Sequence, residues 1–428
     1  MISLLRLLVL CLIPLLGGAS AFADTTRRVS ILDHDAIADG ATVNTAAIQA
    51  TIGQLASSGG GTVVIPPGVF VSGALFLKPG VHLHLEKDAV LRASTDVAAN
   101  FPARRTRIEG HFEESFTPAL INADHCDGLR ITGEGTLDGA GRTIWDDFMA
   151  IRNAAPDKKN FKNLSVPRAR LALIENSRDV VIDGVAFKDS QFWNLHLYRC
   201  RDVLVKNARF TVPDDYEQAP STDGIDVDSS QDVTIDGCTF SVTDDCIAMK
   251  GSKGPFALDD KDSPPVERVR ITNCIFKRGY GAVTLGSEAT IVRDITVENS
   301  RFLGVWHVLH LKVRPDTPQH YENIQLSNLT LDNRSGSILE IRPWTQYFDL
   351  QGQPAPESII RNVTFSDIRG RFGSLGRASG NPGQTDISGI TFSNLDVKLN
   401  RARLQDSAAV RDLKFTHVLI NGTPAPAP

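Results

Sequence analysis

A six-residue pattern of apolar and polar positions occurs eight times between residues 182 and 392 of the chain. It begins with an aliphatic residue, has Gly or Asn at its third position, and ends with Phe in every copy but one. Successive copies begin 23 to 36 residues apart. The copies are IDGVAF at 182–187, VKNARF at 205–210, IDGCTF at 235–240, ITNCIF at 271–276, VENSRF at 297–302, LSNLTL at 326–331, IRNVTF at 360–365 and ISGITF at 387–392.

This repeat predicts a stack of short strands. Alternating apolar and polar residues are typical of a strand, and Gly or Asn at the third position accepts the left-handed backbone of a tight bend. Stacked turns lie about 4.8 Å apart, so we expect Phe to stack on Phe and Asn on Asn. A repeat of about 25 residues without helical periodicity predicts an all-β fold, a right-handed parallel β-helix. The frame of leucine-rich repeats is absent.

The amino-terminal part predicts a helix that caps this solenoid. Asn44 is a candidate N-cap for a helix with an apolar face from Ala47 to Ala56, closed by glycines at 59–61. Such a helix would cover the unpaired strand edges at the end of the stack. We therefore expect one domain over residues 24–428, with the cap and first coils at 24–100 and a disordered Pro-rich tail at 423–428.

The first 23 residues read as a secretory leader. Arg6 is their only charge, the apolar run covers 7–16, and small residues precede a cleavage site before Asp24. The apolar run is too short to span a bilayer, so we expect a periplasmic or secreted protein without a membrane partner. The net charge of −5 excludes a basic surface for nucleic acid. Five cysteines remain after the leader, an odd number, so no complete disulfide framework is expected.

Two acidic segments lie about one coil apart. Asp223 and Asp245 are separated by 22 residues, so we expect them one above the other on one wall, with Asp244 beside them. Close carboxylates repel, which raises at least one pKa and keeps that group protonated. A protonated carboxyl beside ionised ones is the equipment for hydrolysing a glycosidic bond. The alternative is that these residues only bond the backbone of turns, as Asp often does.

Four ordered motifs resemble the polygalacturonase family, glycoside hydrolase family 28. That family carries Asn-Thr-Asp, Asp-Asp, Gly-His-Gly and Arg-Ile-Lys in this order, and the likeness extends to residues 48–70 and 166–200. The corresponding segments here are STDGIDVDSS at 221–230, TDDCIAMKG at 243–251, GYGAVTLGSE at 279–288 and HLKVR at 310–314.

The resemblance implies a right-handed parallel β-helix that hydrolyses galacturonate-containing pectic polymers with inversion and without a metal or other cofactor. Asp244 matches the general acid, Asp223 and Asp245 match the pair that activates water, and Lys312 matches a substrate-binding lysine. Inversion requires the acid and base about 6.5–9.5 Å apart, to leave room for a water.

This chain departs from the family pattern at three positions. Ser221 replaces the family Asn. Tyr280 replaces the His of Gly-His-Gly and cannot become a cation near neutral pH. His310 replaces the Arg of Arg-Ile-Lys and loses a permanent bidentate clamp, for which Arg314 on the same strand face is a candidate substitute. These changes affect the expected sugar specificity more than hydrolysis, because all three carboxylates remain.

Further residues are candidates for binding an anionic sugar. Lys250 adds positive charge near the acidic cluster, and His196 offers a ring that can stack on a sugar, although core packing is an equal alternative for it. The long intervals at 140–167 and 251–266 supply material for a wall that closes one end of a groove. Together with a resemblance of residues 286–288 and 314–322 to bacterial exo-acting members, they favour exo action.

The sequence therefore predicts an exported, monomeric, exo-acting hydrolase of pectic poly- or oligosaccharides. Three alternatives remain open at this point. One is a hydrolase directed at rhamnogalacturonan or rhamnosides, which the Tyr and His substitutions suggest. The others are a polysaccharide lyase of the same fold, which would normally use Ca²⁺, and a non-catalytic carbohydrate-binding protein.

Overall fold

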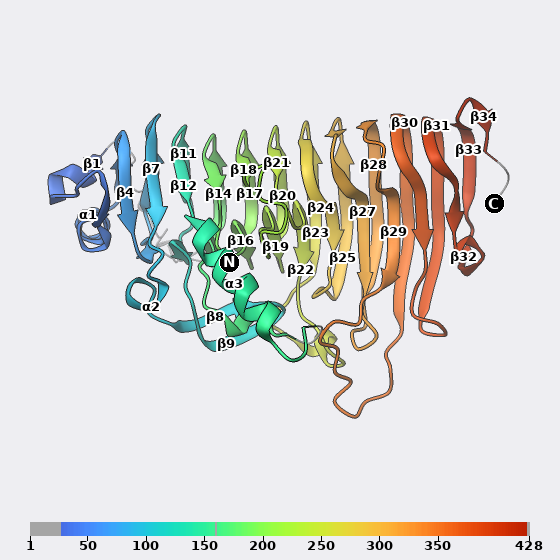
Figure 1. Cartoon of the computed structure of the whole chain (residues 1–428), viewed down its shortest axis with the longest axis horizontal. Coiled ribbons are helices and arrows are strands. Elements are labelled where there is room, and N and C mark those ends of the chain that lie inside the picture. Colours follow the sequence, from blue (N-terminus) through green and yellow to red (C-terminus); the bar gives the residue numbers. More distant parts are fainter. Residues whose placement is uncertain (1–26, 159–160, 426–428) are drawn as a thin grey trace, which may run out of the picture.

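The computed structural model describes residues 27–158 and 161–425, which form an elongated stack of parallel strands (Figure 1). The predicted leader at 1–23 lies outside the described residues. In the middle of the stack, each turn of the chain contributes a strand to each of three faces, as the fold prediction requires. Within the described ranges, no helix combines the length and apolar character needed to cross a membrane.

The first face holds strands that pair in parallel from one end of the stack to the other. They are β1 (Arg28–Ser30), β3 (Gly61–Ile65), β6 (Val81–Leu85), β11 (Arg130–Gly133), β14 (Arg178–Asp183), β17 (Arg201–Lys206), β20 (Gln231–Asp236), β23 (Val266–Thr272), β25 (Ile291–Glu298), β28 (His320–Asp332), β30 (Ser358–Ala378), β31 (Thr385–Gln405) and β33 (Lys414–Ile420), with β32 (Val410–Arg411) at the edge of β31.

The second face is built from shorter strands and ends on β28. They are β2 (Asp39–Val43), β4 (Gly68–Ser72), β7 (Ala89–Ala93), β12 (Thr136–Asp138), β15 (Ala186–Lys188), β18 (Arg209–Thr211), β21 (Thr239–Ser241), β24 (Ile275–Leu285) and β26 (Arg301–Phe302).

The third face carries the acidic segments and ends on β30. It comprises β5 (Leu75–Phe76), β10 (Ile121–Asp124), β13 (Ala172–Glu175), β16 (Leu195–Tyr198), β19 (Ile225–Asp228), β22 (Ile247–Lys250), the second half of β24, β27 (Val305–Val313) and β29 (Ser337–Pro343).

The repeated hexamer builds the interior as predicted. Its third residue has a left-handed backbone in all eight copies, with φ between 51° and 82°. Five closing phenylalanines, from Phe187 to Phe302, stack with ring centroids 4.8–5.2 Å apart and nearly parallel planes. Their spacing equals the strand spacing, so every coil buries its Phe against the next.

The last two copies of the hexamer stand on a different column. Strand pairing aligns Phe302 with Leu331, whereas Phe365 aligns with Leu326 and stacks on Phe392. The repeat is a single pattern in the sequence, but in the structure its phenylalanines form two separate stacks, here called ladders. The reason is that each coil contains more than one bend of the same kind, and the hexamer fits either.

The two ends of the stack differ from the expectations in detail. Helix α1 (Thr45–Ser57) is present at the amino-terminal end, but the side chain of Asn44 does not cap it. Instead, Asn44 Oδ1 accepts a hydrogen bond of 2.6 Å from the Ile37 N–H, because the preceding loop turns back over it. The capping function of α1 stays a prediction.

At the carboxyl end, the expectation of disorder from residue 423 is wrong for its first residues. Strand β34 (Thr423–Pro424) pairs antiparallel with β33, because a turn at Asn421 returns the chain onto the exposed edge. Residues 426–428 lie outside the described residues. The five cysteines after the leader are buried free thiols.

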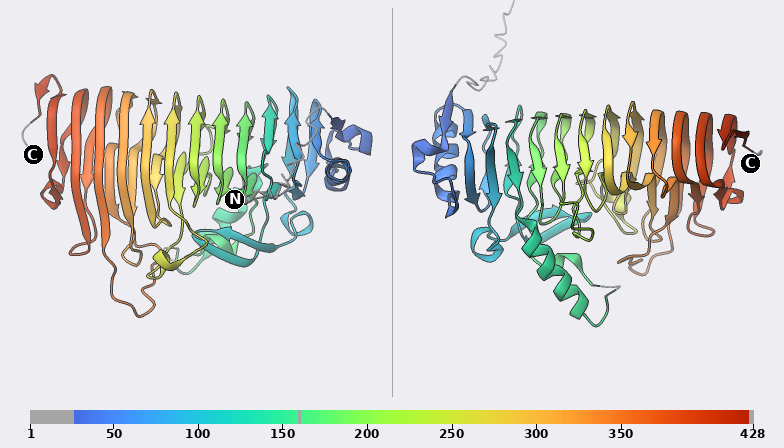
Figure 2. Two further views of the ribbon diagram at one scale, coloured as in Figure 1. Left: turned by 180° about the vertical axis from the view of Figure 1, so that it is seen from behind. Right: turned by 45° about the horizontal axis from the view of Figure 1, so that its top comes forward.

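Segments outside the solenoid gather on one side of it. The antiparallel hairpin of β8 (Arg104–Ile108) and β9 (His111–Phe116), helix α3 (Gly141–Ala154) and the loop at 344–357 project together near the third face (Figures 1 and 2). The remaining helical turns are short. They are α2 (Val97–Asn100), η1 (Ile31–His34), η2 (Asn163–Ser165), η3 (Ala257–Asp259) and η4 (Ser407–Ala409).

Candidate active site

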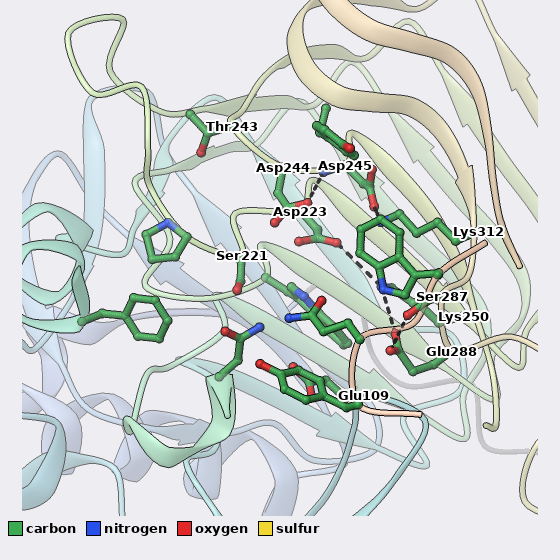
Figure 3. A pocket seen from close by; sticks show the side chains of 18 of the residues that line it. Glu109, Ser221, Asp223, Thr243, Asp244, Asp245, Lys250, Ser287, Glu288 and Lys312 are labelled. Carbon is green, nitrogen blue, oxygen red and sulfur yellow. Dashed lines mark hydrogen bonds and ion pairs between the residues drawn. The ribbon is translucent and has the colours of Figure 1, made fainter. Parts of the chain in front are cut away.

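The structure brings Asp223, Asp244 and Asp245 together, as their spacing predicts (Figure 3). Strands β19 and β22 pair with Ile225 opposite Ile247, an offset of 22 residues that puts Asp223 beside Asp245 on the neighbouring coil. One oxygen of each carboxylate lies within 4.8 Å of the others. This distance between nearest oxygens is shorter than the 6.5–9.5 Å expected between the acid and base of inverting hydrolases, because Asp244 and Asp245 are consecutive residues and Asp223 stands on the adjacent coil.

Asp245 is held as an ionised carboxylate by its neighbours. Lys312 Nζ donates to its Oδ2 at 2.6 Å, and Thr284 Oγ1 donates to its Oδ1 at 2.7 Å. The Gly281 N–H donates to the same Oδ1 at 3.1 Å. Burial alone would raise the pKa of Asp245, but the ammonium groups of Lys312 and Lys250 hold it below its ordinary value.

Gly281 is required at this position by space. A Cβ there would lie 2.0 Å from Thr284 Oγ1 and 2.8 Å from the Oδ1 of Asp245. Any side chain would therefore displace the two groups that bond one another. The second glycine of the Gly-Tyr-Gly segment thus leaves room for the carboxylate of Asp245 on the preceding coil.

Asp244 and Asp223 have pKa values shifted in the opposite direction. Burial, followed by the charge of Asp245, raises the pKa of Asp244. Burial and the charges of Asp244 and Asp226 raise that of Asp223 well above its ordinary value. Carboxyls with pKa values pushed apart in one pocket can divide the roles of proton donor and base.

Lys250 links this cluster to a second group of acids. Its Nζ lies 3.9 Å from Asp223 Oδ2, 3.9 Å from Asp226 Oδ1 and 3.6 Å from Glu288 Oε2. It also lies 5.0 Å from the centre of the Trp193 ring. Although burial opposes its charge, these carboxylates raise the pKa of Lys250 well above its usual range, so it stays a cation in the pocket.

The cluster opens into a pocket of about 330 Å³ with walls from outside the solenoid. Phe148 and Arg152 come from α3, within the interval 140–167 that was expected to form a wall. Glu109 comes from the β8–β9 turn, and Gln346 and Tyr347 come from the loop at 344–357. Sequence reasoning offered Tyr347 as an aromatic residue that could stack on a sugar, and its ring lines the pocket. It missed Glu109 and Gln346, because no motif marks a loop that approaches the site only through tertiary folding.

The interval 251–266 does not line this pocket. Ser252, Lys253 and Phe256 instead line a separate cavity behind the wall, on the far side of Tyr347. The expectation that this interval closes the site is therefore wrong. Its chain packs against the β8–β9 hairpin, where Arg107 Nη1 lies 3.4 Å from Asp260 Oδ2.

Tyr280 and His310 behave differently from each other. Tyr280 lines the pocket, and its hydroxyl accepts a hydrogen bond from the guanidinium of Arg342. His310 is fully buried behind it, with ring centroids 5.5 Å apart, and neither ring nitrogen has a hydrogen bond within the described chain. Burial and the nearby Lys312 lower its pKa well below the ordinary value. The expectation that His310 binds substrate is wrong, because its ring is neutral and enclosed.

Arg314 and His196 also lie away from the pocket. Arg314 forms a bidentate pair with Asp316, at 2.9 and 2.8 Å, and donates to the carbonyls of Gln346 and Tyr347 at 3.0 Å each. It therefore holds the wall instead of replacing the lost substrate clamp. His196 is fully buried, where its Nε2 lies 3.2 Å from Asp228 Oδ2, so it supports the floor and cannot stack on a sugar.

Comparisons with known proteins agree with this geometry. An exopolygalacturonase of Zea mays is 24% identical over 398 residues, covering 88% of this chain and 85% of that protein. A probable polygalacturonase of Vitis vinifera is 24% identical over 395 residues, covering 89% and 76%.

Among solved structures, the exopolygalacturonase of Thermotoga maritima is similar with a TM-score of 0.75 and 22% identity, covering 93% of this chain and 92% of that one. This likeness confirms the β-helix fold. The family model for glycosyl hydrolases family 28 matches residues 66–415. The chain is thus a glycoside hydrolase and belongs to glycosyl hydrolases family 28.

Proposed function

We propose that this protein is an exported, exo-acting hydrolase of galacturonate-containing pectic chains. The observation that carries the proposal is that two neighbouring carboxyl groups in one walled pocket have pKa values shifted in opposite directions. Asp244 has a raised pKa, whereas Asp245 beside it is kept ionised by the ammonium group of Lys312. A proton donor and an ionised carboxylate at one bond are what hydrolysis of a glycosidic link needs.

In the proposed reaction, Asp244 gives its proton to the oxygen that leaves the anomeric carbon. Asp245 and Asp223 orient a water, whose oxygen forms the new bond to that carbon as the glycosidic C–O bond breaks. The water proton passes to Asp245, the member of this pair that is kept ionised. Each turnover therefore consumes one water, after which Asp245 releases its proton to solvent and Asp244 regains one.

The walls support the exo mode. Tyr347 donates a hydrogen bond to the Phe161 carbonyl, which ties the 344–357 loop to the segment after α3 across the edge of the pocket. A chain end fits such an enclosure better than a chain passing through it. The names of the Zea mays and Thermotoga maritima relatives point the same way.

The charges support an acidic sugar. Lys250, Lys312 and Arg152 line the pocket, and the two lysines are buried to within a few per cent of their surface. Arg342 also stands behind Tyr280, so a cation remains beside the position where the family His is replaced. A uronate carboxylate placed there would find a charge-assisted partner.

Inversion and export are part of the proposal. Inversion is what the family resemblance implies, although the nearest oxygens of the three carboxyl groups lie within 4.8 Å of one another. We propose that a water held by the carboxyl groups of Asp223 and Asp245 takes the place of a water in a wide gap. Export rests on the leader at 1–23, and amino-terminal sequencing of protein recovered outside the cytoplasm tests it.

The substrate is tested by incubating the purified enzyme with polygalacturonate and with rhamnogalacturonan. We expect new reducing ends from polygalacturonate, release of short products from the start, and no unsaturated products. Cleavage of rhamnogalacturonan but not of polygalacturonate would contradict the proposed substrate, and unsaturated products would indicate a lyase. Proton NMR of the first products gives the anomer, and retention of the α configuration would contradict inversion.

The acid is tested by Asp244→Asn. Loss of the proton donor is expected to lower kcat by about 10³-fold with little change in KM, because general acid catalysis contributes on this order. Asp214→Asn is the matched control, since Asp214 is an exposed aspartate outside the pocket. Full activity of the Asp244 variant would show that another group donates the proton.

A further inference from the structure

A second pocket, of about 230 Å³, lies on the coils that follow the active site. Strand pairing places it on the same column as the catalytic carboxylates. The Gly281 N–H bonds Asp245, and Gly281 pairs in turn with His307 of the next coil. His307 pairs with Ser337, Ser337 with Ser374, and Ser374 with Arg401, and all four line the second pocket.

The distance between the two pockets follows from the strand spacing. Each coil advances about 4.8 Å, so His307 lies about 10 Å along the axis from Asp245, and Arg401 lies about 24 Å from it. The pockets are also in contact at one point. The ring of Tyr280 lines the first, and its centroid lies 5.2 Å from that of His307, which lines the second.

The chemistry of the second pocket suits a chain of acidic sugars. Three arginines line it, Arg377, Arg401 and Arg403, against a single carboxyl, that of Glu340. The side chain of Arg377 is engaged with Gln405 and Asp406. The charge of Arg401 acts on the Glu340 carboxyl, but the side chains of Arg401 and Arg403 make no hydrogen bond or salt bridge within the described part of the chain. A free guanidinium is a planar fork that matches a carboxylate.

An aromatic side chain completes this surface. Trp306 lines the pocket and is 61% exposed, which is unusual for the largest apolar side chain. Its ring has no aromatic or cationic partner among the described residues, so its face is free for a sugar ring. A register shift in the pairing of β30 and β31, between Ser374 and Gly376, marks an extra residue in the 401–404 segment. Such bulges redirect side chains, here on the strand that carries both free arginines.

We propose that this second pocket, built by Trp306, Arg401 and Arg403, binds the uronate units that extend from the cleaved bond toward the carboxyl-terminal coils. The inference rests on the proposed function, since it assigns the direction in which the acidic polysaccharide leaves the active site. None of the segments that wall the first pocket (α3, the β8–β9 turn and the 344–357 loop) lines the second one, so a chain can extend along it. The pocket on the later coils therefore holds the remainder of a long chain while its end is cleaved.

The test compares substrates of different length. In Arg401→Gln/Arg403→Gln, KM for polygalacturonate is expected to rise about tenfold while kcat is retained, because two charge-assisted contacts are lost. For the shortest galacturonate oligomer that the wild-type enzyme cleaves, KM is expected to change less than twofold, because that oligomer does not reach the pocket. Trp306→Ala is expected to show the same dependence on length.

Arg369→Gln is the matched control. Arg369 is an exposed arginine on β30 without a hydrogen bond or ion pair in the described chain, and it does not line the pocket. Its removal is expected to leave both KM values unchanged. An unchanged KM for polygalacturonate in the double variant, or an equal rise for short and long substrates, would overturn the inference.

Failure of the proposed function is distinguishable from failure of this inference. If the wild-type enzyme cleaves no galacturonate oligomer, the proposed substrate is wrong. Calorimetry of polygalacturonate binding at low salt then tests, without catalysis, whether the second pocket binds this polymer. About tenfold weaker binding by the double variant than by Arg369→Gln supports the pocket, and equal affinity overturns it.

Discussion

Lys312 Nζ lies 2.6 Å from Asp245 Oδ2, although the two residues are 67 positions apart in the chain. Both are buried, and each provides the charge that makes burial of the other tolerable. The pair also divides the pocket electrostatically. It keeps Asp245 ionised, while Asp244 next to it keeps its proton to a higher pH than an ordinary aspartate.

Lys312→Gln is expected to reduce kcat by about 10²-fold or more, because Asp245 loses its ammonium partner inside the protein. The pKa of Asp245 then rises, so the acidic limb of the kcat/KM profile shifts to higher pH. Lys277→Gln, which removes an exposed lysine, is the control and is expected to change neither quantity. A loss of activity with an unmoved acidic limb would mean that Lys312 acts only on the substrate.

The pH dependence of activity follows from the same two shifts. Asp245 must be ionised and Asp244 protonated, so kcat/KM is expected to rise as Asp245 loses its proton and to fall as Asp244 loses its own. The raised pKa of Asp244 moves the descending limb above the ordinary carboxyl range.

Lys250→Gln tests this assignment. Burial raises the pKa of Asp244, and the ammonium group of Lys250, which acts on that carboxyl across the buried pocket, partly offsets this rise. Removing this charge is expected to raise the pKa of Asp244 further and to shift the descending limb to higher pH. A limb that does not move, measured with the same substrate, would assign it to another group.

Arg314→Gln is expected to loosen the pocket wall. The substitution removes the hydrogen bonds to the carbonyls of Gln346 and Tyr347 and leaves Asp316, which is 2% exposed, without its cation. We expect a loss of about 2–4 kcal/mol in the free energy of unfolding and a raised KM.

The matched control for the wall is Arg411→Gln. Arg411 also binds both oxygens of a carboxylate, that of Asp386, but both side chains are exposed. Its loss is expected to cost less than about 1 kcal/mol in denaturant unfolding and to leave KM unchanged. Equal effects of the two substitutions would show that burial is not what gives the Arg314 pair its importance.

A buried phenylalanine inside the first ladder is expected to contribute more stability than one at the carboxyl-terminal end of the second ladder. Phe240→Ala removes a fully buried ring that stacks on Phe210 at 5.0 Å and on Phe276 at 5.2 Å. Such a loss costs about 3–5 kcal/mol, measured by denaturant unfolding. Phe415→Ala removes a half-buried ring that has one aromatic neighbour, Phe392, tilted by 35°, and is expected to cost less than half as much. Similar costs at both sites would contradict a ladder stabilised coil by coil.

Local sequence determines much of the fold of this protein, because the same short hexamer recurs from coil to coil. The left-handed Gly or Asn and the closing Phe of the hexamer predict the bend, the interior and the stack. Once the fold is a stack, the 22-residue offset between Asp223 and Asp245 is enough to place them side by side. Which column a hexamer joins is a different matter, since the pattern at 360–365 fits two bends equally well.

The tertiary structure alone decides what surrounds the carboxylates. Glu109, Gln346 and Tyr347 reach the pocket on excursions from distant coils, and nothing in their local sequence records where those excursions end. The same holds for orientation. The sequence places His310 and Arg314 on the strand of Lys312, but packing buries the first behind Tyr280 and turns the second toward Asp316. Periodicity fixes backbone position, whereas exposure and partners depend on packing between segments far apart in the chain.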